Sequence, residues 1–504
     1  MAMAQIQRAG GGNVGRIFAA QAQRYPDDIA LSAGDENLTY SQLNDRVNRL
    51  ANHMTAKGVG HGGRVALLAR NCMAFIEVEL AAAKIGAITT AMNWRLSPVE
   101  LRHCIDLTTP DMLIVQPDYL ERLDGLDCLC LGEPYDKALS EAAPDEPLAE
   151  AAGEDGLIII FTSGTTGLPK GALISHRAMI ARTAIYGAET GAPARDTFVA
   201  WTPLFHMGAN DFALATLMRG GRVIIVDGYQ PDQLVTAIRD ERMHYLPLIP
   251  GMIMEFIAVL RDGKVQPKGI GMIGAMADLV PRQQLAEITA LLDAPYLNTF
   301  GSTETGMPPA TANYVAVGTA PTSLSKRQND FCEIRLVDAD DNDVPDGSPG
   351  ELAIRGPSLF SGYWNNDEAN AESFRGGWFH MGDVFRRNPD GSLDFVDRVK
   401  YMIKSGGENI YPAEIEQHIL ADPRIADAAV VRKPDARWGE VPVVFAARAQ
   451  SDLSAEDLLA TCKGKLASYK LPKEVHFIDF DDFPRSTTGK IQRHELEARL
   501  SEKQ

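Results

Sequence analysis

The chain has 504 residues, too many for a single hydrophobic core, so several folding units are expected. Its hydrophobic fraction of 45% and charged fraction of 23% are typical of a soluble globular protein. The net charge of −18 argues against a nucleic-acid-binding protein, and the chain lacks the uncharged apolar run of about 18 residues that predicts a membrane span.

Residues 1–15 are polar and glycine-rich and lack the apolar core of a secretion signal. The six cysteines include no C-x-x-C pair, which is typical of free thiols in a reducing compartment. We therefore expect a cytoplasmic protein.

Strands and helices alternate through residues 14–299. Strands are expected at 29–32, 64–69, 87–91, 112–115, 128–131, 156–161, 197–200, 222–226, 245–249, 270–273 and 296–299. Helices are expected at 14–25, 41–57, 74–85, from 97, from 211, and at 231–241, 252–260 and 281–291. Such alternation predicts parallel sheets with helices on their faces. We expect two α/β layers, built from residues 1–155 and 156–310, with 136–155 as a surface connection.

From residue 311 the pattern changes to short strands, at 331–337, 351–355 and 393–396. The acidic run 338–343 has no glycine at its sixth position and no glutamate at its twelfth, which favours a hairpin turn over a calcium loop. The expected fold is therefore α/β. Two doubly wound α/β subdomains and a β-rich subdomain form a large N-terminal domain (1–397), and residues 401–504 form a small α+β domain.

A loop rich in glycine and hydroxyl groups follows the buried strand 156–161. Its backbone can form a concave surface for an anion, and its hydroxyls and lysine suit a polyphosphate. It is not a Walker A loop, because Pro169 stands where that motif needs its second glycine. A flexible surface turn is the alternative. The candidate residues are Thr162, Ser163, Gly164, Thr165, Thr166, Gly167 and Lys170.

A second motif, residues 296–306, follows the end of a strand, where ligands bind in open α/β sheets. Thr303 can donate to a phosphate oxygen. Glu304 beside phosphate oxygens requires a cation between them, and Mg²⁺ is the usual choice. A capped helix start would explain both residues equally well.

Two further motifs lie near the C-terminus, at 377–416 and 484–490. The first contains an acidic turn ending at Asp383 and the glycine pair Gly406 and Gly407. The second ends at Lys490, a position where a solvated charge is the ordinary interpretation.

Taken in order, the four motifs resemble those of the adenylate-forming family of acyl-CoA synthetases, luciferases and peptide-synthetase adenylation domains, over nearly the whole chain. The resemblance implies that MgATP activates a carboxylate as an acyl-adenylate, which then passes to CoA. It also implies a hinge at 398–400, centred on Lys400, about which the C-terminal domain moves. Lys490 would neutralise two mutually repelling anions during adenylation.

The resemblance assigns roles to residues along the whole chain. Thr303, Glu304, His206 and Lys490 would be catalytic, and Thr165 and Glu304 would hold Mg²⁺. ATP and AMP would be bound by the loop residues above together with Gly274, Ala275, Phe300, Gly301, Ser302, Thr303, Asp383 and Arg398. The family commonly has tyrosine where this chain has Phe300. CoA would be bound by Lys404, Ser405, Gly406, Gly407, Glu408, Trp438, Tyr469 and Lys473.

An apolar acyl pocket is also implied, lined by Trp201, Phe205, His206, Met207, Gly208, Met276 and Met307. Amino-acid-activating relatives usually carry aspartate at the place of His206, so a hydrophobic acid, fatty or aromatic, is expected. Ordinary core roles for the methionines and a structural role for His206 are left open.

The predicted enzyme is an AMP-forming acid–thiol ligase with ATP, Mg²⁺ and CoA. Its expected partners are small molecules, without nucleic acid or a membrane span, and a homodimer is left open. The alternatives are a stand-alone adenylation enzyme that loads a carrier protein and a nucleotide-binding regulatory protein without turnover.

Overall fold

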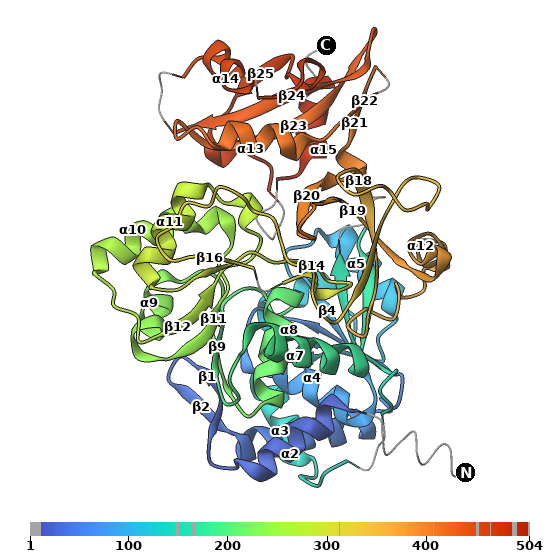
Figure 1. The fold of residues 1–504 in the computed structure, drawn as a ribbon. Helices are drawn as coiled ribbons and strands as arrows, with labels where there is room; N and C mark the ends of the chain where they lie inside the picture. The colour runs from blue at the N-terminus through green and yellow to red at the C-terminus, as the bar shows by residue number, and fades with distance from the viewer. Residues whose placement is uncertain are drawn as a thin grey trace.

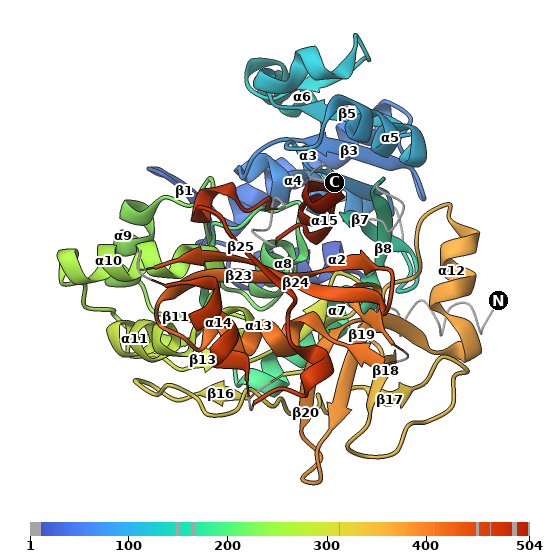
Figure 2. The same cartoon turned by 90° about the horizontal axis from the view of Figure 1, so that it is seen from above.

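The structure is a computed structural model that describes residues 12–147, 151–162, 168–311, 313–406, 408–449, 453–463, 465–485 and 491–501. A small C-terminal domain stands on a large N-terminal domain, and the chain passes between them after β20 (Figure 1). Seen from above, the C-terminal sheet lies across the middle of the N-terminal domain (Figure 2).

The first sheet of the N-terminal domain has the order β6-β5-β3-β4-β7-β8. Its strands are Leu129–Cys130, Met112–Val115, Arg64–Leu68, Ile88–Met92, Gly156–Thr162 and Lys170–Ser175. All neighbours are parallel except β8, which runs antiparallel to β7. Strands β3, β4 and β7 are almost wholly buried, as their continuous apolar runs predict.

Two more sheets complete the α/β part of this domain. One has the order β2-β1-β10-β9 (Glu36–Thr39, Ile29–Ala33, Arg222–Ile225, Thr197–Ala200). The other has the order β11-β12-β13-β16 (Met243–Leu246, Ile270–Ile273, Tyr296–Leu297, Tyr314–Val315). Because β7 joins the first sheet and β1 pairs with β10, the predicted division into layers at residue 155 is wrong.

Helices pack between and around these sheets. They are α2 (Val14–Arg24), α3 (Tyr40–Ala56), α4 (Met73–Ile85), α5 (Pro98–Thr108), α6 (Glu133–Glu141), α7 (His176–Thr190), α8 (Met207–Met218), α9 (Pro231–Asp240), α10 (Ile253–Gly263) and α11 (Arg282–Leu292). Helices α4 and α8 are apolar on nearly all sides and almost wholly buried, as expected of helices enclosed between layers.

Two helices correct the expectations. Helix α6 occupies part of the predicted surface connection, because its proline at the first turn and its apolar face of Tyr135, Ala138 and Leu139 allow it to pack on the domain. Helix α8 begins at Met207 and not at 211, because His206 caps it. The helix expected from 97 is α5, which begins with a capping box of Ser97 and Glu100.

The β-rich subdomain has the antiparallel order β17-β18-β19-β20 (Glu333–Val337, Pro349–Arg355, Phe379–Arg387, Leu393–Arg398), with α12 (Asp367–Ser373) beside it. A separate hairpin joins β14 (Phe300–Ser302) to β15 (Gly306–Ala310). The acidic run 338–343 is a turn, in which the Asp338 carboxylate accepts the N–H groups of Asp340 and Asn342, as predicted.

The C-terminal domain has a sheet in the order β22-β21-β24-β23, with β25 parallel to β24. The strands are Glu408–Ile410, Ile403–Ser405, Gly439–Arg448, Ile425–Asp435 and Glu474–Phe477. Helices α13 (Pro412–Leu420), α14 (Ala455–Cys462) and α15 (Arg493–Ser501) accompany it. The predicted fold class is confirmed. Within the described residues, no helix has the length and apolarity to cross a bilayer.

Candidate active site

A short segment of the chain, residues 358–364, joins two of the predicted motifs and is called the strap below. It runs along β8, where the Leu173 N–H donates to Gly362 O at 3.0 Å. At its other side, the Phe360 N–H donates to Glu304 O at 2.8 Å. The strap therefore ties the strand that leaves the polyphosphate loop to the turn that carries Glu304.

Side chains from these segments meet through Tyr363 of the strap. The Tyr363 hydroxyl donates to Glu304 Oε1 at 3.0 Å. The Lys170 ammonium lies over the Tyr363 ring, 5.0 Å from its centre. Thr162 and Lys170 pair across the β7–β8 hairpin, at the two ends of the loop. The structure thus brings three of the predicted site residues, Thr162, Lys170 and Glu304, into one region.

Arg182, a buried arginine that is not among the predicted site residues, holds the Thr303–Glu304 turn by hydrogen bonds. Arg182 of α7 donates through Nη2 to Thr303 O at 2.9 Å and through Nε to Ser358 O at 3.1 Å. Its Nη1 pairs with Asp211 Oδ2 of α8 at 3.0 Å, and both side chains are less than a tenth exposed. The guanidinium therefore fixes the backbone at Thr303, just before Glu304, and the start of the strap at Ser358.

Asp383 and Arg398, two of the predicted ATP- and AMP-binding residues, pair with each other. Arg398 Nε donates to Asp383 Oδ1 at 2.9 Å, across the β19–β20 ladder. The Asp383 carboxylate raises the pKa of Arg398 against the effect of burial, and the Glu304 carboxylate acts in the same direction.

The neighbouring Asp397, which the sequence analysis did not single out, links the two domains. It is buried, and its carboxylate accepts the N–H of Arg398 and that of Ala413, in the first turn of α13, both at 2.7 Å. Burial raises the pKa of Asp397 to about 6, Arg493 opposes this effect, and Glu416 adds to it. The predicted hinge residue Lys400 lies just beyond, in a short 3₁₀ turn.

Gly274, Ala275 and Met276, predicted to contact the nucleotide or the acyl group, form a segment with a left-handed backbone at Gly274 and Met276. Gly274 has φ +69°, and a Cβ there would lie 2.1 Å from Cζ of the buried Tyr296. The Tyr296 hydroxyl donates to Ala275 O at 3.1 Å, and Met276 also has a positive φ. Tyr296 therefore packs against this segment, while Ala275 and Met276 remain partly exposed.

Phe300 and its neighbours form the start of the β14–β15 hairpin. The Phe300 side chain is 2% exposed and packs on the rings of Phe385 and Phe395. A Cβ on Gly301 would lie 2.0 Å from Gly306 O, so the hairpin requires glycine there. The phenyl ring of Phe300 is thus a core group, and only Gly301, Ser302 and Glu304 of this motif are partly exposed.

The predicted acyl-pocket residues divide into two groups. Trp201, Phe205 and Met307 are buried, and the Trp201 indole N–H donates to Pro247 O at 2.9 Å. The partly buried ones are His206, Met207, Gly208 and Met276. His206 Nδ1 accepts the Gly208 N–H at 3.2 Å, so the ring proton resides on Nε2, the nitrogen that can donate to a carboxylate.

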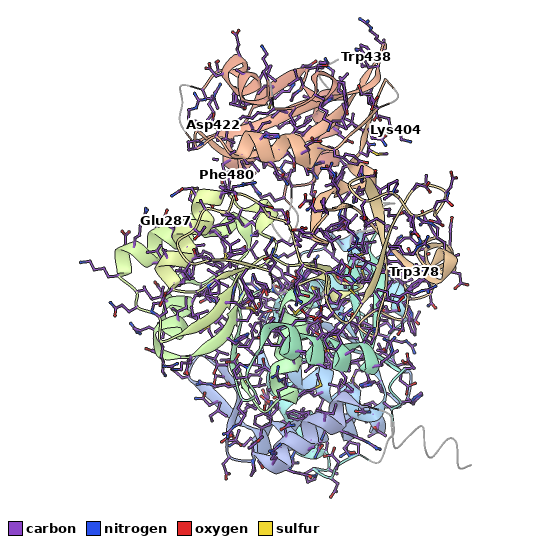
Figure 3. The ribbon with its side chains drawn as sticks, viewed as in Figure 1. Glu287, Trp378, Lys404, Asp422, Trp438 and Phe480 are labelled. Carbon is purple, nitrogen blue, oxygen red and sulfur yellow. The ribbon has the colours of Figure 1, made fainter. Side chains whose placement is uncertain are left out.

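Two of the predicted CoA residues, Lys404 and Trp438, lie on the same side of the C-terminal domain (Figure 3). The Gly406 N–H donates to Trp438 O at 2.7 Å, and Gly406 has φ +61°. A Cβ on Gly406 would lie 2.8 Å from the Trp438 indole. Ser405 is buried, while Lys404, Glu408, Trp438, Tyr469 and Lys473 are exposed.

Several predicted residues lie outside the described part of the chain, namely Ser163, Gly164, Thr165, Thr166, Gly167, Gly407 and Lys490.

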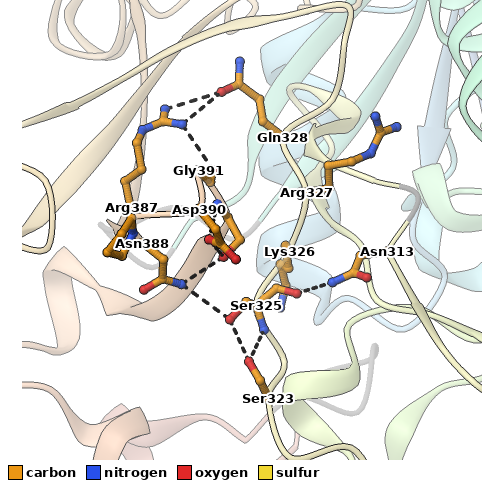
Figure 4. A pocket seen from close by; sticks show the side chains of 12 residues that line it. Asn313, Ser323, Ser325, Lys326, Arg327, Gln328, Arg387, Asn388, Asp390 and Gly391 are labelled. Atoms are coloured by element: carbon orange, nitrogen blue, oxygen red, sulfur yellow. Dashed lines mark hydrogen bonds between the residues drawn. The ribbon is translucent and has the colours of Figure 1, made fainter.

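A polar hollow elsewhere, near the β19–β20 hairpin, is lined by residues of the segments 323–328 and 387–392 (Figure 4). None of the predicted site residues lines it, so it is separate from the candidate site.

The predicted magnesium ion can be tested against the donors present. Within the described segments, no cluster of three or more His, Cys, Asp or Glu side chains could hold a metal ion by itself. A magnesium ion that binds with a nucleotide needs only one or two carboxylates, because phosphate oxygens and water complete its shell. Glu304 fits that pattern, as a partly buried carboxylate with one oxygen fixed by a tyrosine hydroxyl.

Comparison with known proteins identifies the family. The model of the AMP-binding enzyme family matches residues 18–364, and that of the AMP-binding enzyme C-terminal domain matches residues 414–490. This chain belongs to the AMP-binding enzyme family. The predicted family, fold class and enzyme class, an AMP-forming acid–thiol ligase using ATP and CoA, are confirmed.

Named relatives of this family member cover almost its full length. An indoleacetate–CoA ligase of Aromatoleum aromaticum is 33% identical over 497 residues, which cover 95% of this chain and 96% of that protein. A feruloyl-CoA synthase of an Amycolatopsis species is 34% identical over 488 residues, covering 95% and 97%. The solved o-succinylbenzoate CoA synthetase of Bacillus subtilis, with its acyl-adenylate intermediate, has a TM-score of 0.83 at 25% identity, covering 95% and 97%.

Proposed function

We propose that this AMP-forming acyl-CoA synthetase activates an aromatic carboxylic acid. The observation that carries the adenylation chemistry is the contact of one side chain, Tyr363, with both Lys170 and Glu304, in a chain of this family that also holds the Asp383–Arg398 pair. The named relatives act on indoleacetate and on ferulate, both aromatic carboxylates. His206 has apolar neighbours and carries no carboxylate that could pair with the ammonium group of an amino acid. Both features agree with an aromatic acid that has no ammonium group.

In the first half-reaction, a carboxylate oxygen of the acid attacks the α-phosphorus of ATP. The bond to pyrophosphate breaks, and acyl-adenylate forms. Lys170 and Thr303 would hold phosphate oxygens, and Asp383 would accept the ribose hydroxyls. Glu304 would hold the magnesium ion, which supplies positive charge against the triphosphate when bound. His206 would donate from Nε2 to the acid's carboxylate.

Lys490 would place its ammonium between the two reacting anions. At about 4 Å and an effective dielectric constant near 20, such a charge is worth about 4 kcal/mol. That is roughly a thousandfold in rate. In the second half-reaction, the CoA sulfur attacks the acyl carbon and AMP leaves. Gly406 would let the pantetheine arm approach, after the C-terminal domain (401–504) has turned about Lys400.

The test is a panel of acids assayed with ATP, Mg²⁺ and CoA. The aromatic acids are indoleacetate, ferulate and benzoate, and the comparison acids are octanoate, a fatty acid, and phenylalanine, an amino acid. The rates of pyrophosphate and AMP release are measured for each. We expect aromatic acids to give the highest kcat/KM and acyl-CoA as product. Preference for octanoate would contradict the aromatic assignment. Turnover with a holo-carrier protein but not with CoA would contradict the acceptor.

A further inference from the structure

Tyr363 is the one described residue of the strap whose side chain touches two charged groups of the proposed nucleotide site. Its hydroxyl donates to Glu304 Oε1 at 3.0 Å, and its ring lies 5.0 Å from the Lys170 ammonium. Lys170 and Glu304 come from different sheets and are separated by 134 positions in the sequence. A single side chain is therefore in contact with both charges.

The tyrosine itself is held firmly in place. Its N–H donates to Asn370 Oδ1 at 2.6 Å, and the Asn370 amide donates back to Tyr363 O at 2.8 Å. Its ring packs edge-on against Phe360, with centroids 4.9 Å apart. Burial, with a further contribution from Glu304, raises the pKa of Tyr363, so the hydroxyl remains a donor at neutral pH.

We propose that Tyr363 is a positioning residue for adenylation, whose hydroxyl orients the Glu304 carboxylate toward magnesium and whose ring holds the Lys170 ammonium toward the triphosphate. The inference rests on the proposed function. A hydrogen bond to a metal-binding carboxylate fixes its direction, and loss of such a contact typically costs about 10- to 100-fold in metal affinity or activity. The ring adds a cation–π contact to a lysine that binds phosphate.

Two variants separate the contributions of the hydroxyl and the ring. Tyr363→Phe removes the bond to Glu304 and keeps the ring below Lys170, whereas Tyr363→Leu removes both. Tyr135→Phe is a matched control, because the buried Tyr135 hydroxyl also donates to a glutamate, Glu77, at 2.7 Å. That pair joins α6 to α4, among residues that the proposed function does not use.

Metal binding is measured first, without turnover. Manganese is titrated into enzyme with α,β-methylene-ATP, and free Mn²⁺ is followed by electron paramagnetic resonance. We expect Tyr363→Phe to weaken Mn²⁺ binding about tenfold or more and Tyr135→Phe to leave it unchanged. Binding of the analogue in EDTA should fall several-fold in Tyr363→Leu only, because that variant alone loses the cation–π contact.

Turnover then separates the half-reactions. The Mg²⁺ concentration for half-maximal pyrophosphate release should rise in Tyr363→Phe, while conversion of supplied acyl-adenylate and CoA stays at the wild-type rate. The proposal is overturned if Mn²⁺ binding in Tyr363→Phe matches wild type, or if both half-reactions fall equally together with stability. If the wild-type enzyme releases no pyrophosphate with any acid, the proposed function is refuted. The Mn²⁺ titration would still show whether the Tyr363 hydroxyl affects metal binding.

Discussion

Replacing Arg182 by methionine should damage both stability and adenylation. The Arg182 guanidinium and the Asp211 carboxylate are 3.0 Å apart, with side chains 3% and 8% exposed. Removing one partner of such a buried pair leaves the other charge unpaired and costs about 3–5 kcal/mol. The free energy of unfolding of a typical domain is only about 5–15 kcal/mol, so this change should remove a large fraction of the stability. Burial alone already raises the pKa of Asp211, and Arg182 opposes that effect.

A second variant separates the two consequences. Arg182→Met/Asp211→Leu replaces the pair by apolar side chains, and such replacements are often neutral or stabilising. We expect the double variant to regain most of the wild-type urea midpoint. It should not regain adenylation, because Thr303 O and Ser358 O still lack their donor.

The assay compares urea unfolding with acid-dependent pyrophosphate release for wild type, the single variant and the double variant. Pyrophosphate release should remain about tenfold or more below wild type in the double variant, as expected when support of a metal-binding group is lost. An unchanged urea midpoint in Arg182→Met would refute the energetic argument. Full activity of the double variant would refute the claim that the guanidinium positions the Glu304 turn.

Three further outcomes are expected. Lys490→Ala should slow pyrophosphate release about a thousandfold but spare the conversion of supplied acyl-adenylate, and equal loss of both would contradict its role. Gly406→Leu should spare pyrophosphate release but slow thioesterification about tenfold or more. A left-handed backbone costs an L-residue about 1–2 kcal/mol, and the new side chain would clash with Trp438. Unimpaired thioesterification would contradict the role of Gly406. The protonated form of Asp397 stabilises the fold, because its pKa rises from about 3.9 in an unfolded chain to about 6. This contribution is complete below pH 4 and is lost as the pH passes 6. The free energies of unfolding of wild type and Asp397→Asn, measured by urea titration at pH 4.5 and at pH 7.5, should therefore diverge in favour of the variant by about 2 kcal/mol, and parallel profiles would refute the assignment.

Much of the α/β core was predictable from local pattern. Strands such as Gly156–Thr162 and Met112–Val115 are short apolar runs between turn residues, and their limits agree with the sequence to within a residue. Strand β8 and helix α7 were missed. Helix α7 buries His176 and Arg182 among its apolar residues, so its sequence lacks a clear polar and apolar face.

The assignment of strands to sheets was less predictable. Nothing local in Ile29–Ala33 indicates that its parallel partner is Arg222–Ile225, because pairing over that separation is decided by tertiary packing. The supposed boundary at residue 155 failed for the same reason.

The site shows the same division between local and distant information. Glu304, Asp383 and Arg398 could be named because they stand in ordered motifs with recognisable chemistry. Tyr363, Arg182 and Asp397 could not, since each acts through a contact that only the folded chain creates. A buried arginine in a helix has no sequence signature until its carbonyl partners are known.

The pairing of β1 with β10 also affects how the chain can be made. On a ribosome, β1 emerges long before its parallel neighbour, and at about 5–20 residues per second the delay is roughly ten to forty seconds. In that interval its strand partner is β2 alone, and a lone hairpin is marginally stable in water. The edge of β1 that later receives β10 thus stays unpaired during early translation, and an unpaired strand edge is a template for non-native pairing.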